Sequence, residues 1–125
     1  MAEKEMPLNE FEKALFHEGL RRRGATEAEI ADLLTKVSIA SRVVAGSGAV
    51  IHLNDNSGGG FSKFTGIDKP HVHPLEVFSV GFRYKGGNSA EADAFANDNK
   101  LLDFIELYNF DGELWPEVVE DYEFA

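Results

Sequence analysis

Two histidines and one glutamate in the middle of the chain have residue types and a spacing that could bind a metal ion. His71 and His73 are separated by one residue, so on an extended strand both side chains would point to the same side. Glu76 could add a carboxylate oxygen, which would leave open coordination positions of the kind that a catalytic metal uses. Regular alternation turns Glu76 away from both histidines unless Pro74 breaks the register. We therefore favour a Pro-flanked polar loop with ordinary exposed histidines over a site for a divalent metal.

The same stretch resembles the first motif of the cupin family, in which glycine, His-x-His, glutamate and a second glycine lie on consecutive strands of a β-barrel. Those places are taken here by Gly66, His71, His73, Glu76 and Gly81. The match is incomplete because only two residues separate His73 from Glu76 and no histidine follows His73. The resemblance implies a metal-dependent small-molecule binder or enzyme, and this is the alternative interpretation.

Other patterns that could support catalysis are incomplete. The polar, glycine-rich residues 54–60 lack the bidentate glutamate of a calcium loop and the Gly-Lys-Ser/Thr of a phosphate loop. No Gly-x-Ser-x-Gly elbow is present. The absence of cysteine excludes disulfides, thiolate nucleophiles and Cys-bound zinc, and favours a reducing compartment, the cytoplasm. We therefore expect a protein without a catalytic constellation or bound cofactor, and not an enzyme.

The acidic side chains are concentrated in the last part of the chain. The net charge is −10, yet residues 1–90 hold 11 acidic and 11 basic side chains. The last 35 residues thus contain 11 acids against one base, Lys100, and carry the whole net charge. Such a field repels phosphate backbones, so direct nucleic-acid binding is disfavoured. It agrees with a solvated acidic face or, as a sharper hypothesis, with a docking face for a basic protein.

The sequence predicts two helices near its start, within residues 8–37. Apolar residues recur there at three-and-four spacing, and Asn9 with Glu12 and Thr26 with Glu29 form capping boxes. Neither helix is long enough to be stable alone in water, so each must bury its apolar stripe against a larger element. We predict a helical hairpin packed on the rest of the chain.

The pattern of apolar and polar residues after the helices predicts an antiparallel sheet of four to five strands. The expected strands are residues 42–53, 61–65, 77–85, 90–96 and 100–110. The fold class is therefore α+β, with one domain over residues 1–125, a flexible segment 1–7, and a sheet with an acidic tail over 42–125. No apolar run is long enough for a membrane span, so we expect no membrane contact.

Residues 97–116 resemble the closing pattern of several families of small bacterial proteins. A polar turn precedes a strand of leucine, two variable residues, an apolar residue, glutamate, an apolar residue and an aromatic, which leads into Asp-Gly and Trp-Pro. Many of these families look like immunity proteins of polymorphic toxin systems, which implies a non-enzymatic protein that neutralises a basic toxin. Carboxylates would steer the partner, and Trp115 would be a hot spot if exposed or a core residue if buried. The expected binding residues are Asp103, Glu106, Asp111, Glu113, Trp115 and Glu117. A homo-oligomer is left open.

Overall fold

The computed structural model of this chain describes residues 5–65, 75–85 and 87–125. The described part contains two α-helices, one 3-10 helix and six strands, so the predicted α+β class is confirmed. In chain order the elements are α1 (Glu10–Arg22), α2 (Glu27–Leu34), β1 (Val37–Ala45), β2 (Gly48–Asp55), η1 (Ser62–Phe64), β3 (Glu76–Tyr84), β4 (Asn88–Ala96), β5 (Leu102–Asn109) and β6 (Glu123–Phe124).

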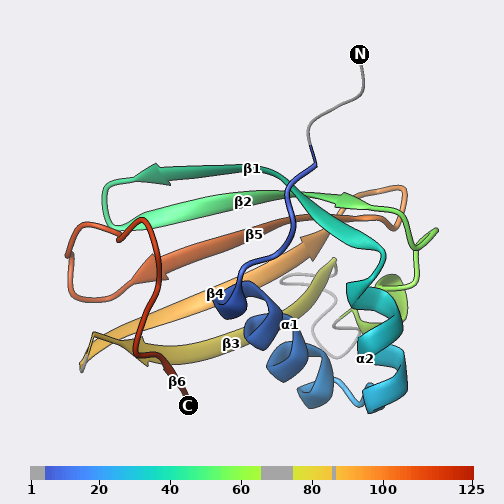
Figure 1. Cartoon of the computed structure of the whole chain (residues 1–125), viewed down its shortest axis with the longest axis horizontal. Helices are drawn as coiled ribbons and strands as arrows, with labels where there is room; N and C mark the ends of the chain where they lie inside the picture. The colour runs from blue at the N-terminus through green and yellow to red at the C-terminus, as the bar shows by residue number, and fades with distance from the viewer. Residues whose placement is uncertain (1–4, 66–74, 86) are drawn as a thin grey trace.

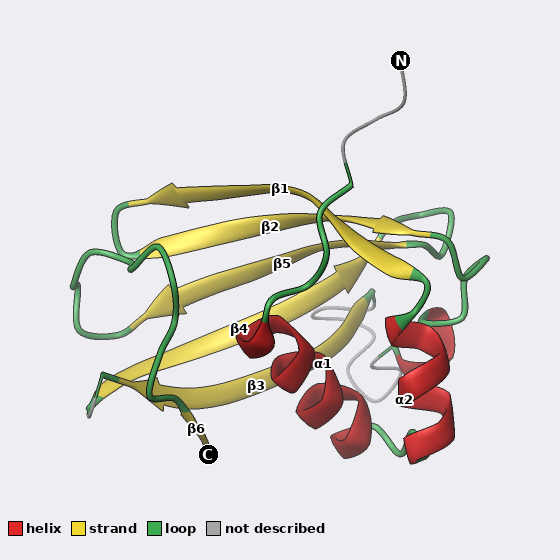
Figure 2. Ribbon diagram, viewed as in Figure 1, coloured by secondary structure: helices red, strands yellow, loops and turns green. Residues whose placement is uncertain are grey.

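The strands form one antiparallel sheet in the order β1-β2-β5-β4-β3-β6. Both helices lie on the same side of this sheet, α1 over β3 and α2 beside α1 (Figures 1 and 2). The segment between β5 and β6 crosses the same side, to the left of α1 in Figure 1. Neither α1 nor α2 lies over the opposite face of the sheet (Figure 2).

The two predicted capping boxes are present and explain where the helices begin. The Asn9 side chain accepts from the Glu12 N–H at 2.8 Å, and the Glu12 side chain accepts from the Asn9 N–H at 2.9 Å. Thr26 and Glu29 exchange the same two bonds at 3.1 and 2.9 Å. Each box satisfies backbone N–H groups that have no partner inside the helix.

The core lies between the helices and the covered face of the sheet. Four alanines on β4, all buried, leave room for the larger side chains of the neighbouring strands: Ala90, Ala92, Ala94 and Ala96. The helix α1 approaches β3 closely at Gly19, where an added Cβ would lie 2.4 Å from the Phe78 ring. Nearer its start, α1 places the Phe11 ring 5.1 Å from that of Phe82. These ring contacts fix α1 on the sheet.

Several predicted boundaries are wrong, each for a local reason. The strand expected over residues 42–53 is a hairpin of two strands, because Gly46 takes a positive φ of 60° and makes the tight turn between them. The strand expected over 61–65 is the 3-10 helix η1, which follows the buried Phe61. The sheet has six strands rather than four to five, because the tail returns to pair with β3 as β6. In the segment expected to be flexible, Met6 bridges the outer edge of β1.

Candidate docking surface

The side of the sheet opposite α1 and α2, here called the open face, is built from rows of side chains that pair across neighbouring strands. The first row comprises Ser79, Asp93, Glu106, Val50 and Val43. The second comprises Gly81, Glu91, Tyr108, Gly48 and Ala45. The third comprises Phe95, Phe104, His52 and Ser41. Directly opposed residues in a sheet share one face, so these rows form a continuous surface.

Aromatic and aliphatic side chains occupy much of the open face. The rings of Phe95 and Phe104 lie 5.1 Å apart, and Tyr108 contacts Phe110 edge-on at 5.6 Å. Phe110 is 63% exposed and Val43 is 50% exposed. An antiparallel sheet usually presents polar residues on the side that faces water. Apolar groups gathered on such a side are typical of a surface that contacts another molecule.

Carboxylates and one phenol lie in the middle of these apolar groups. The Tyr108 hydroxyl donates to Glu91, and its oxygen lies 3.2 Å from an Asp93 carboxylate oxygen. Ser79 donates to the other Asp93 oxygen at 2.6 Å. The single hydroxyl hydrogen of Tyr108 can serve only one of the two carboxylates.

The surroundings of this network shift two pKa values. Burial, together with the neighbouring Glu91 carboxylate, raises the pKa of Asp93 from 3.8 to about 6 against the hydrogen bonds from Ser79 and Tyr108. Burial and the Glu91 carboxylate also raise the pKa of the Tyr108 hydroxyl. The open face therefore loses negative charge as the pH falls toward 6.

The predicted binding residues do not form one surface. Glu106 is exposed in the first row of the open face, whereas Asp103 is half-buried where the pairing of β4 and β5 shifts register. Asp111 accepts a hydrogen bond from the N–H of Ser89, the second residue of β4, at 3.0 Å, so its carboxylate has a structural partner. Glu113 is exposed in the loop after β5, and Glu117 lies on the helix side of the sheet.

Trp115 is a core residue, as the second of the two interpretations expects. It is only 7% exposed, and its ring lies 5.3 Å from that of Tyr84 and 6.3 Å from that of Phe82. The Trp115 N–H donates to the carbonyl of Gly46 at 2.9 Å, which ties the segment after β5 to the hairpin turn. Trp115 is thus placed to stabilise the fold, and in this structure it is not an exposed side chain.

The metal-binding interpretation falls largely outside the described residues, because His71 and His73 are not among them. Glu76 is described, and its carboxylate pairs with the Arg23 guanidinium at 3.1 Å. Within residues 5–65, 75–85 and 87–125, no group of three or more His, Asp or Glu could hold a metal ion. A narrow cavity of about 50 Å³, lined by Arg42, Trp115 and Glu117, is far below the several hundred Å³ typical of small-molecule sites.

Sequence reasoning missed the central part of the open face. Glu91 and Asp93 alternate with the buried alanines of β4, and this period-two pattern was a usable signal that both carboxylates share a face. The pairing of β4 with β5, which brings them to Tyr108, is set by the register of the hairpin.

No family model, curated protein or solved structure matches this chain in comparisons with each. In the part of the chain that the structure describes, neither helix has the length and apolar character required to cross a lipid bilayer.

Proposed function

We propose that this protein is a non-enzymatic binding domain of the immunity type, which docks a basic protein on the open face of its sheet. The observation that carries the proposal is the combination of exposed aromatic and aliphatic side chains with carboxylates on the face of the sheet opposite α1 and α2. Aromatic groups supply binding energy when they are buried on docking, and carboxylates select a basic partner and speed its approach.

The charge distribution supports the same kind of partner. The chain carries a net charge of −10, and the paired rows of the open face contain Glu91, Asp93 and Glu106. A basic nuclease toxin would be attracted by this field, and a carboxylate-bearing face could occupy the place of nucleic-acid phosphates in its cleft. The resemblance of residues 97–116 to immunity proteins agrees with such a role.

The test uses the whole chain as bait in a lysate of its own cells, followed by binding measurements with the purified partner. The wild type should retain a basic protein that elutes as the salt concentration rises. Glu106→Lys and Phe110→Ser should each weaken the complex at least tenfold. Asp98→Lys makes the same charge change in the turn after β4 and should have a much smaller effect. Full binding by both open-face variants would refute the proposal.

The alternative metal-dependent function is tested by elemental analysis of protein purified without a histidine tag. On the proposal above, the protein should contain no stoichiometric metal, and the double variant His71→Ala, His73→Ala should bind the partner as the wild type does. Near-stoichiometric metal that is lost in the double variant would instead support the cupin-like interpretation.

A further inference from the structure

A second surface lies on the helix side of the sheet, where the start of α1 meets the segment that leads into β6. This groove, called here the acidic groove, holds about 530 Å³ of free space. Its apolar lining includes Phe11, Val118 and Tyr122, and its acidic lining comprises Glu10, Glu120 and Asp121. Val118 is 56% exposed although it is aliphatic, so apolar surface remains uncovered at the groove.

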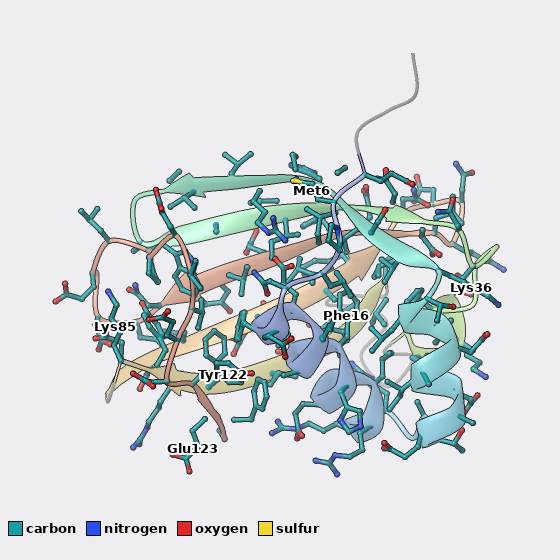
Figure 3. All side chains as sticks on the ribbon, viewed as in Figure 1. Met6, Phe16, Lys36, Lys85, Tyr122 and Glu123 are labelled. Carbon is teal, nitrogen blue, oxygen red and sulfur yellow. The ribbon has the colours of Figure 1, made fainter. Side chains whose placement is uncertain are left out.

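The walls of the acidic groove are fixed by contacts to the sheet and to α1. The Tyr122 ring meets the Phe11 ring edge-on at 5.1 Å, and in Figure 3 Tyr122 lies between the tail and α1. The Lys85 N–H donates to the Glu120 carbonyl, and the Ala125 N–H donates to the Gly81 carbonyl at 2.9 Å. A groove with walls held in this way loses little conformational freedom when it binds a ligand.

The charge of the groove selects its occupant. From Glu113 to Glu123 the chain contains five acidic residues and no basic one, and Glu10 adds a carboxylate from the first turn of α1. A second copy of this chain would bring another net charge of −10 to this surface, which opposes self-association. A segment with apolar side chains on one side and Lys or Arg on the other matches both the lining and the charge.

We propose that the acidic groove binds a basic amphipathic segment of a partner protein, independently of the open face. The apolar side chains of that segment would cover Val118 and Tyr122, and its cations would lie beside Glu10, Glu120 and Asp121. The two surfaces lie on opposite sides of the sheet. A partner that binds the open face and the acidic groove at once would bind more tightly than one that binds either surface alone.

The experiment uses the full chain and a synthetic amphipathic peptide of leucine and lysine that contains no aromatic residue. Trp115 is the single tryptophan of the chain, and it lines a small cavity that shares Phe11 and Val119 with the groove, so its emission is a second readout beside affinity. The affinity is measured by calorimetry. The test variant is Val118→Ser, Glu120→Gln. The control is Leu114→Ser, Asp98→Asn, which removes one carboxylate charge and one exposed aliphatic side chain outside both the groove lining and the rows of the open face.

The proposal expects the peptide to shift the Trp115 emission, the test variant to weaken binding at least tenfold, and the control to weaken it less than twofold. Circular dichroism and urea unfolding confirm that both variants are folded. Equal weakening by the two variants would mean non-specific attraction to an acidic protein and would overturn the proposal. The same conclusion follows if the wild type does not bind, or if the control variant loses more affinity. None of these outcomes bears on the open face, which is tested through Glu106 and Phe110.

Discussion

Replacing Asp93 by asparagine should stabilise the protein at neutral pH and leave its stability unchanged near pH 4. The pKa of Asp93 is raised from 3.8 to about 6 in the folded state. The folded state therefore holds a proton more tightly than the unfolded state, and stability falls as the pH rises between these values. A pKa difference of this size corresponds to about 2–3 kcal/mol of stability at pH 7 and above. Asparagine keeps an acceptor for the Ser79 hydroxyl and removes the buried charge.

The assay is urea unfolding of wild type and Asp93→Asn at several values between pH 4 and pH 8, followed by Trp115 fluorescence. The difference in free energy of unfolding should increase from near zero at pH 4 to about 2–3 kcal/mol at pH 8. Asp98→Asn, in an exposed turn, is the control and should show a difference that does not depend on pH. A constant difference for Asp93→Asn, or one that decreases with pH, would refute the reasoning. A gain in stability would also show that the ionised Asp93 side chain lowers the free energy of unfolding of the wild type.

Three further changes test the packing. Arg42→Met should destabilise by about 3–5 kcal/mol in urea unfolding, because the nearly buried Glu12 carboxylate loses both of its 2.7 Å bonds to the guanidinium. Adding Glu12→Leu should recover only part of this loss, because leucine also removes the acceptor of the Asn9 N–H. Gly19→Ala should cost about 1–3 kcal/mol in the same assay, because the new methyl group meets the Phe78 ring, and an unchanged midpoint would contradict this contact. Asp55→Ala should cost about 1–2 kcal/mol, because its carboxylate accepts hydrogen bonds from the N–H groups of Ser57 and Leu102. Hydrogen exchange at these two amides should be faster in the variant, and unchanged exchange would argue against this role.

The helices and the strongest strands could be predicted because their signals are local. The capping box of Asn9 and Glu12 and the alternation that gives β3 depend on residues a few positions apart. The turn at Gly46 was not recognised because valines lie on both sides of it, at Val43, Val44 and Val50, and a glycine within a strand also indicates a bend. The helix η1 was missed because the spacing of Phe61 and Phe64 becomes informative only when their burial is known.

The candidate site was only partly predictable because it depends on which strands are neighbours. Glu106 was named from the sequence, but its row on the open face includes Asp93 and Val50 through pairings across three strands. The burial of Trp115 depends on the return of the tail over the sheet. Whether that tail would cross the sheet or fray could not be decided from the local pattern. A concentration of charge in sequence therefore did not predict one charged surface in space.

The position of β5 has a consequence for how the protein folds during synthesis. The hairpins β1–β2 and β3–β4 can each form locally, but only β5 joins them, and His52 of β2 pairs with Phe104 about fifty residues later in the chain. Until β5 has left the ribosome, the inner edges of both hairpins have no strand to pair with and can recruit other nascent chains. The acidic residues that follow β5 emerge after it, so a chain that stalls or is truncated before them exposes these edges without most of the charge that would keep it in solution.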